Sequence, residues 1–464
     1  MKTLGLDIGT TTISAVVYDG QTADSRTVDN GAFLPGEIWE KIQDPDIIYN
    51  KALESVKVLL ERNPNVSAIG LTGQMHGIVY LDKEGNPVSP LYIWQDGRGD
   101  LPFEKGVSWA AHLSQLTGYP LATGYGMVTH YYNLNHDLIP KDAAVFCTIH
   151  DYVAMKLAGR TEPLIDPTDA ASLGLYNAPE GCFDLKAMEK TGISSDLVPK
   201  IMKDPCLGTG ELGIPVYAGI GDNQASFLGA TDGRTDALLV NVGTGSQISV
   251  YSPRYIQTDT LETRPFPDGG WLLVGASLCG GRSYALLEKF FGMTVKLVTG
   301  KECSTYGSMS ELLDSCPEPE DIPVVDTTFQ GTRKDPSLRG SVQNLDIHNF
   351  TPLHLIYGFM HGMADELFGM YRGYLESRGK PIDSMIGSGN GLRKNPHLCR
   401  IFETTFGCPM TLSGNNEEAA CGAAIYAARH CENRQECPVK SQNNWIFKRK
   451  KDWKQRVNSH RDIK

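Results

Sequence analysis

The sequence predicts an α/β fold in two domains. The chain has 464 residues, which is more than one ordinary hydrophobic core holds and enough for two. Short aliphatic runs alternate with amphipathic segments of helical period, an order typical of α/β proteins. Residues 238–251 repeat the strand, Gly/Thr turn and strand with which the chain opens. We therefore expect the second half to begin as the first does.

Strands and helices alternate in the first half. The β-branched runs at 2–7 and 13–19 flank a Gly/Thr turn and predict a hairpin. Residues 47–60 are amphipathic and predict a helix, and the apolar run 66–72 predicts a buried strand. A further helix is expected over residues 150–158.

The second half shows the same alternation after its opening hairpin. Helical periodicity spans residues 352–374, 396–406 and 417–429, and residues 382–386 predict a short strand. The second half is therefore also expected to be an α/β domain.

The expected domain boundary lies among polar turn-forming residues at 231–236. This boundary gives an N-terminal domain of residues 1–233, a C-terminal domain of residues 234–432 and a basic tail of residues 433–464. The tail contains Lys448-Arg449-Lys450-Lys451. Such a charge run is usually a solvated terminus, and an anionic partner is the alternative.

The composition indicates a globular protein that acts on small molecules. A net charge of −11 argues against a general nucleic-acid binder, whose surface would be basic. The N-terminus lacks the pattern of a secretory signal, and no apolar stretch reaches membrane-spanning length. The 11 cysteines are scattered and are expected to be reduced thiols. We expect a cytoplasmic protein without a membrane or nucleic-acid partner, and a homodimer is compatible with the sequence.

Two Gly/Thr turns, one in each expected domain, are candidate phosphate sites. The first is Gly9-Thr10-Thr11-Thr12, which follows Asp7 at a strand end, and the second is Gly243-Thr244-Gly245. Such turns offer N–H groups and hydroxyls to phosphate, and Asp7 can hold Mg²⁺ through water. One turn alone fits a plain hairpin equally well. A pair of turns suits the two sides of a triphosphate.

Asp222 is the candidate catalytic residue. It follows the apolar run 216–220 and precedes the domain boundary. A sugar hydroxyl attacks poorly unless a nearby carboxylate accepts its proton, and positioning supplies most of the catalysis in phosphoryl transfer. The alternative is an aspartate at the start of a helix over residues 223–228.

Two polar and aromatic blocks are candidates for binding a polyol. Their side chains offer donors, acceptors and a flat apolar wall, a mixture that suits a small polar ligand. For a single histidine or tryptophan the alternative is ordinary packing. The residues are Gln74, Met75, His76, Trp94, Gln95, Asp96 and Arg98.

A glycine-rich loop at residues 387–391 can let an adenine ring lie against the backbone. A dinucleotide-binding fold needs a helix that begins on such a loop and an acid at the end of the next strand. Residues 392–394 intervene before the expected helix, and the strand at 410–412 ends without an acid. The dinucleotide alternative is therefore disfavoured.

In this order the motifs resemble the FGGY carbohydrate kinases of the actin and Hsp70-like ATPase superfamily, over residues 3–429. The resemblance implies two ribonuclease-H-like domains with an interdomain cleft that binds ATP, Mg²⁺ and a sugar. It places Asp222 at the family's catalytic-base position, and it implies that Gly281, Gly389 and Asn395 line the adenosine site.

Several segments resemble the family members that phosphorylate sedoheptulose, a seven-carbon ketose. Members that act on xylulose share the block at 74–77 and typically have Asn where Gln95 stands, and they are the alternative. A nucleotide-driven clamp is the non-enzymatic alternative, which the polyol blocks disfavour. The segments similar to the sedoheptulose members are 94–98, 117–119, 123–126, 148–152 and 275–278.

Overall fold

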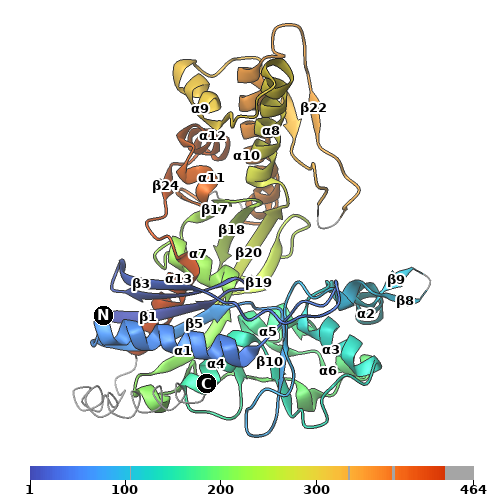
Figure 1. Ribbon diagram of the computed structural model, residues 1–464, viewed down its shortest axis with the longest axis vertical. Helices are drawn as coiled ribbons and strands as arrows, with labels where there is room; N and C mark the ends of the chain where they lie inside the picture. Colours follow the sequence, from blue (N-terminus) through green and yellow to red (C-terminus); the bar gives the residue numbers. More distant parts are fainter. Residues whose placement is uncertain (105, 333–334, 379–381, 434–464) are drawn as a thin grey trace. The chain divides into compact units, whose positions relative to one another are not determined.

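The structure is a computed structural model that describes residues 1–104, 106–332, 335–378 and 382–433 (Figure 1). All but the first residue of the expected basic tail lies outside the described residues. By its internal contacts the chain forms two compact units. One is Met1–Gly233 together with the described residues from Asn415, and the other is Arg234–Gly414.

The first unit is built on a mixed sheet of six strands in the order β15-β16-β5-β1-β2-β3. β1, β5 and β16 are parallel neighbours, so their carboxyl ends meet at one edge of the sheet. Its strands are β1 (Lys2–Ile8), β2 (Thr12–Tyr18), β3 (Thr22–Asp29), β5 (Val66–Gly73), β15 (Cys206–Gly208) and β16 (Val216–Gly221).

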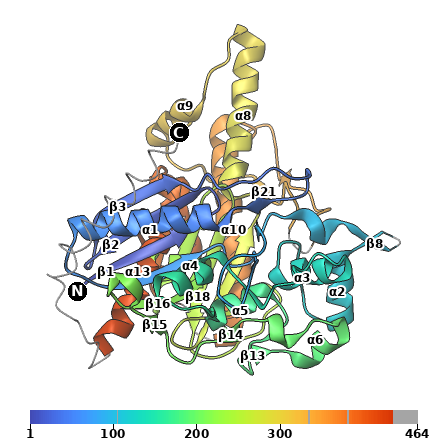
Figure 2. The ribbon, with the colours of Figure 1, turned by 60° about the horizontal axis from the view of Figure 1, so that its bottom comes forward.

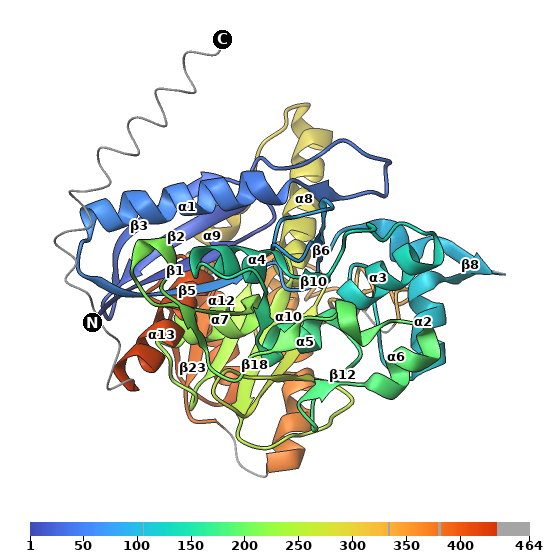
Figure 3. The same cartoon turned by 90° about the horizontal axis from the view of Figure 1, so that it is seen from below.

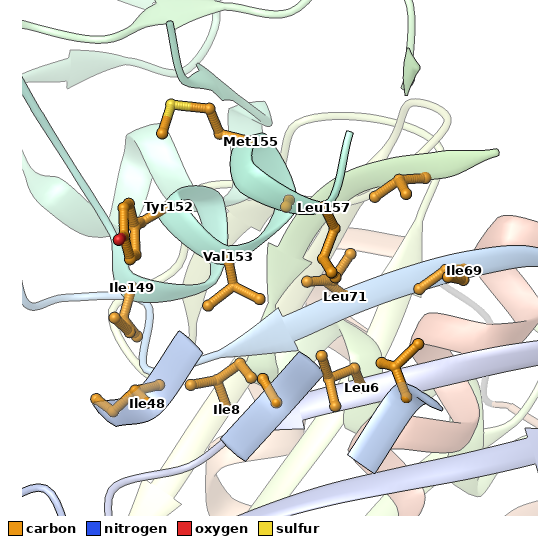
Figure 4. Packing of buried hydrophobic residues seen from close by; sticks show 14 of the residues in the cluster. Leu6, Ile8, Ile48, Ile69, Leu71, Ile149, Tyr152, Val153, Met155 and Leu157 are labelled. Atoms are coloured by element: carbon orange, nitrogen blue, oxygen red, sulfur yellow. The ribbon is translucent and has the colours of Figure 1, made fainter. Parts of the chain in front are cut away.

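Helices cover both faces of this sheet (Figures 2 and 3). α1 (Pro45–Arg62) and α4 (Ile149–Leu157) pack with the apolar side chains that alternate along β1 and β5, such as Leu6 and Leu71 (Figure 4). α7 (Asp222–Ala230) and α13 (Glu418–Asn433) pack together on the other face. Both expected helices and all three expected strands of this sheet are therefore confirmed, with ends shifted by a few residues.

α13 lies directly on the strands of the first unit. A Cβ at Gly5 would stand 1.7 Å from the carbonyl oxygen of Ala420, and one at Gly70 would stand 2.0 Å from that of Ala423. Only glycine allows so close an approach. The sequence prediction put this helix in the domain of residues 234–432, whereas its contacts in the structure are with the first sheet.

The rest of the first unit is a lobe with its own core, between residues 78 and 201. Short strand pairs and helices form this part and its surroundings. They are β4 (Ile42–Gln43), β6 (Val79–Leu81), β7 (Leu91–Tyr92), β8 (Pro102–Glu104), β9 (Val107–Ser108), α2 (Trp109–Thr117), α3 (Gly126–Asn135), β10 (Val145–Cys147), β11 (Leu164–Ile165), α5 (Pro167–Leu173), β12 (Tyr176–Asn177), β13 (Cys182–Phe183), α6 (Leu185–Thr191) and β14 (Lys200–Ile201).

The second unit repeats the plan of the first. Its sheet has the order β19-β20-β18-β17-β23-β24, with β17, β23 and β24 parallel and β17, β18 and β20 antiparallel. The internal repeat predicted from sequence is therefore confirmed. The strands are β17 (Leu238–Val242), β18 (Ser246–Ser252), β19 (Glu262–Pro265), β20 (Trp271–Ser277), β23 (Met385–Ser388) and β24 (Met410–Leu412), with a separate pair β21 (Val324–Asp326) and β22 (Ser341–Gln343).

Helices of the second unit bury one core against this sheet. α10 contacts α8, α12 and the strands β18 and β20. The strand expected at 382–386 begins at Met385, because Met385 is the residue that pairs with Leu238 of β17. The helices are α8 (Gly280–Thr299), α9 (Tyr306–Ser315), α10 (Pro352–Arg378), α11 (Asn390–Arg393) and α12 (Pro396–Phe406). Within the described residues no helix has both the length and the apolar character needed to cross a membrane.

Candidate active site

Asp7 and Asp222 lie at the same edge of the first sheet. Asp7 is the last but one residue of β1, and Asp222 begins α7 immediately after β16, which runs parallel to β1 through β5. Burial, and then the negative charge of Asp222, raise the pKa of Asp7 to about 7. A cation between the two carboxylates would relieve this repulsion, so the pair fits Mg²⁺ chemically.

Hydroxyl groups fix the two residues that directly precede Asp222. Thr72 Oγ1 donates to the carbonyl of Ile220 at 2.7 Å, and the N–H of Gly221 donates to Thr168 Oγ1 at 2.9 Å. Thr168 in turn donates to Asp166 Oδ1 at 2.6 Å. The three polar side chains are buried, so the backbone that presents Asp222 is held by groups shielded from water. No sequence motif singled out Asp166 or Thr168.

A buried group of titratable side chains lies near these carboxylates. His150 Nε2 is 2.9 Å from Asp169 Oδ2, and Thr148 Oγ1 donates to Asp151 Oδ2 at 2.7 Å. Burial raises the pKa of Asp151 to about 8 and raises the pKa of Asp169, whereas burial lowers the pKa of His150. His150, Asp151 and Asp169 offer ligand atoms within 4.8 Å of one another, a spacing that can hold a metal ion.

The second candidate phosphate turn is closed by the start of α8. The N–H groups of Gly281 and Arg282 donate to the carbonyls of Gly243 and Thr244, each at 3.0 Å. A Cβ at Gly281 would lie 2.3 Å from the Gly243 oxygen, so glycine is required there. The structure thus brings Gly281 to the turn, where the positive end of a helix dipole favours an anion.

The other two adenosine candidates lie further along the second unit. Gly389 has a φ of +84°, and a Cβ there would be 2.5 Å from the Val242 carbonyl oxygen, at the end of β17. Asn395 caps α12, since its Oδ1 accepts from the Leu398 N–H at 3.1 Å. Its amide nitrogen is 3.4 Å from Met360 Sδ. The Asn395 side chain is therefore already engaged within the second unit.

Two residues of the polyol blocks are exposed beside the first turn. The Trp94 side chain is 47% exposed, and its Nε1–H donates to Thr10 Oγ1 at 2.9 Å. Gln95 is also exposed. The structure thus brings an expected sugar wall into contact with an expected phosphate turn.

Three further residues of these blocks directly follow β5. Gln74 and Met75 are buried, and His76 is half-buried. His76 stacks on Tyr125 with ring centres 4.6 Å apart, and its Nδ1 lies 2.7 Å from the carbonyl of Ser172. Because a carbonyl only accepts, Nδ1 carries the proton and Nε2 is the acceptor of the neutral ring.

Asp96 and Arg98 are enclosed in the protein, whereas the sequence predicted that they contact a sugar. Both are at most 1% exposed, and Arg98 donates to both oxygens of Asp96 and to Asn133. The guanidinium lies 4.1 Å from the centre of the Tyr92 ring. A buried arginine needs such partners. The pair fixes the segment that carries Trp94 and Gln95.

Family models match both halves of the chain. The N-terminal domain of the FGGY family of carbohydrate kinases matches residues 2–229, and the C-terminal domain of that family matches residues 238–431. The chain belongs to the FGGY family of carbohydrate kinases. It is therefore an ATP-dependent sugar kinase, and the expected fold class is confirmed.

Individual relatives of this FGGY kinase span nearly its whole length. Human sedoheptulokinase is 27% identical over 94% of this chain and 98% of its own, and the xylulose kinase of Staphylococcus xylosus is 25% identical over 92% and 90%. A solved xylulose kinase from Rhodospirillum rubrum has a TM-score of 0.77 at 21% identity, over 95% of this chain and 91% of its own. The gluconate kinase structure from Lactobacillus acidophilus has a TM-score of 0.77 at 19% identity, over 96% and 92%. These structures support the fold.

Proposed function

We propose that this kinase transfers the terminal phosphate of ATP to sedoheptulose and releases sedoheptulose 7-phosphate. The observation that carries the proposal is the similarity to sedoheptulokinases along almost the entire chain, at 27% identity to the human and 28% to the mouse protein. The exposed side chains of Trp94 and Gln95 support it, because they offer an apolar wall and an amide to a long polyol.

Asp222 is the proposed general base. It accepts the proton of the attacking sugar hydroxyl as the oxygen bonds to phosphorus and the bond to the leaving ADP breaks. Its placement at a strand end with a fixed backbone supports this role, because positioning contributes most of the catalysis in phosphoryl transfer. When bound, Mg²⁺ offsets the charge of the phosphate oxygens, and Asp7 is the residue proposed to hold it.

The remaining residues are proposed to bind the two substrates. The turns at 9–12 and 243–245 bind the phosphates, and Gly281, Gly389 and Asn395 line the adenosine site. Gln74, Met75, His76, Trp94 and Gln95 line the sugar site. Asp96 and Arg98 act by holding the segment that carries Trp94.

Xylulose is the second candidate substrate, favoured by the 25% identity to a xylulose kinase over 92% of the chain. A coupled assay of ADP release with sedoheptulose, xylulose, ribulose, fructose and glycerol separates the two. We expect the highest kcat/KM with sedoheptulose. A higher value with xylulose would overturn the assignment of the sugar and leave the kinase activity in place.

A further inference from the structure

The carbonyl groups of the first phosphate turn accept hydrogen bonds from other segments of the protein. The Gly9 carbonyl accepts from Asn30 Nδ2 at 2.8 Å and from Gln74 Nε2 at 3.4 Å, and the Thr10 carbonyl accepts from Gln43 Nε2 at 2.8 Å. The backbone N–H of Asn30 donates to the Thr11 carbonyl at 2.7 Å. Three successive carbonyls of the turn thus have donors from outside it.

The three amide side chains come from separate segments and are linked to one another. Asn30 follows β3, Gln43 lies in β4, and Gln74 follows β5. Asn30 and Gln43 are fully buried, and Gln74 is 5% exposed. Gln74 Nε2 also donates to Gln43 Oε1 at 3.1 Å. Gln43 therefore holds both the turn and the amide of Gln74.

Two of these amides also carry a cost in stability. Among the described residues, Asn30 Oδ1 and Gln74 Oε1 are buried acceptors without a hydrogen-bond partner. A buried acceptor that lacks a partner disfavours the folded state, so each of these two amides combines this cost with the gain from its donor. What the three amides provide to the turn is their N–H groups, each of which donates to one of its carbonyls.

Such bonding prepares the turn for an anion. Carbonyl oxygens carry partial negative charge and repel phosphate, whereas N–H groups and hydroxyls attract it. The carbonyls of Gly9, Thr10 and Thr11 are held by donors inside the protein, and Thr11 and Thr12 are exposed residues of the turn. A turn fixed in this form needs no rearrangement when ATP binds.

We propose that Asn30, Gln43 and Gln74 are positioning residues that hold the first phosphate turn in its ATP-binding form. This role goes beyond the sugar contact expected for Gln74, and it rests on the proposed function only in taking the turn as a phosphate site. Gln43 has the central place, because its amide bonds to both the turn and Gln74.

The test is Gln43→Met, which keeps the length of the side chain and removes its donor. We expect the dissociation constant of ATP-Mg, measured by calorimetry on the full chain, to rise about tenfold, the worth of one buried hydrogen bond. The inhibition constant of adenosine, which has no phosphate, should stay within about twofold of the wild-type value. The KM for the sugar should also stay within about twofold of the wild-type value.

Gln115→Met is the matched control, because Gln115 is exposed on α2, and it should change none of these constants. Asn30→Leu removes the donor to Gly9 by a separate substitution and should reproduce the pattern of Gln43→Met. If thermal unfolding shows that Gln43→Met does not fold, the affinities of Asn30→Leu test the proposal.

A wild-type affinity for ATP-Mg in Gln43→Met and Asn30→Leu would overturn the proposal. So would an equal loss of ATP-Mg and adenosine affinity, since that reports a general distortion. The calorimetry needs no sugar. Failure of every sugar in the assay would therefore overturn the proposed function, while selective loss of ATP-Mg affinity would still support the positioning role.

Discussion

Trp94 Nε1 lies 2.9 Å from Thr10 Oγ1, so the aromatic wall of the proposed sugar site donates a hydrogen bond to the proposed phosphate turn. Both residues belong to the first unit. The bond joins two side chains 84 positions apart in the sequence. A substitution at either residue should therefore change the KM values of both ATP-Mg and the sugar.

Trp94→Phe tests this link, because it keeps an aromatic wall and removes the indole donor. We expect the KM for ATP-Mg to rise about threefold to tenfold, the effect of losing one partly exposed hydrogen bond. Initial rates measured while both substrates are varied check the prediction. An unchanged KM for ATP-Mg would confine Trp94 to the sugar.

Asp222→Asn should lower turnover by about two orders of magnitude or more, because it removes the proton acceptor and nearly keeps the shape. The affinities for ATP-Mg and sugar should stay close to those of the wild type. Steady-state rates together with calorimetry give both quantities. Asp196→Asn, at an exposed position, is the control, and near-native turnover of Asp222→Asn would exclude Asp222 as the base.

Thr168→Val should impair both stability and turnover. It removes the acceptor of the Gly221 N–H and the hydroxyl that donates to Asp166. We expect the free energy of unfolding to fall by about 1–3 kcal/mol, the effect of leaving buried polar groups unpaired. Turnover should fall while the KM for ATP-Mg changes little. Thr168→Ser keeps the hydroxyl and should restore turnover, and failure of this rescue would count against the hydrogen bond as the cause.

Stability should fall as the pH rises from about 6.5 to 8. Burial raises the pKa of Asp151 from 3.8 to about 8, so in this range the folded protein keeps a proton that the unfolded chain has lost. One such proton lowers the free energy of unfolding by up to about 1.4 kcal/mol per pH unit. Asp7, with a pKa of about 7, and Asp169, whose pKa is also raised, act in the same direction.

His150 acts in the opposite direction below its ordinary pKa of 6.5, because burial lowers its pKa in the folded state. The window above 6.5 therefore isolates the carboxyl groups. Asp151→Asn should show a shallower fall of the unfolding temperature between pH 6.5 and 8 than the wild type. Equal slopes in the two proteins would remove Asp151 as a source of the pH dependence.

Gln95→Asn should shift the ratio of kcat/KM values from sedoheptulose towards five-carbon ketoses. The shorter amide reaches less far along a bound chain, and a hydroxyl left without a partner weakens discrimination for the longer sugar. The coupled assay with sedoheptulose and xylulose measures this ratio. A ratio indifferent to the substitution would place the selecting residue elsewhere.

Sequence alone determined the elements whose signals are local. The two Gly/Thr turns lie between aliphatic runs, so hairpins and their repetition in each half followed from composition and spacing. Asp7 stands at the end of the aliphatic run 2–7, and Asp222 follows the apolar run 216–220. That their strands run parallel in one sheet, so that both residues meet at one edge, came from the structure.

The tertiary structure decided what depends on contacts between distant segments. Periodicity predicted α13 as a helix, and the structure joins it to the first sheet, with a close approach at Gly5 and Gly70. The sequence predicted that Arg98 contacts a sugar, whereas the structure pairs it with Asp96. Asn30 and Gln43 carry no motif at all. Their proposed role arises because the end of β3 and β4 bring their amides to a turn formed some twenty to thirty residues earlier, a relation that local pattern does not encode.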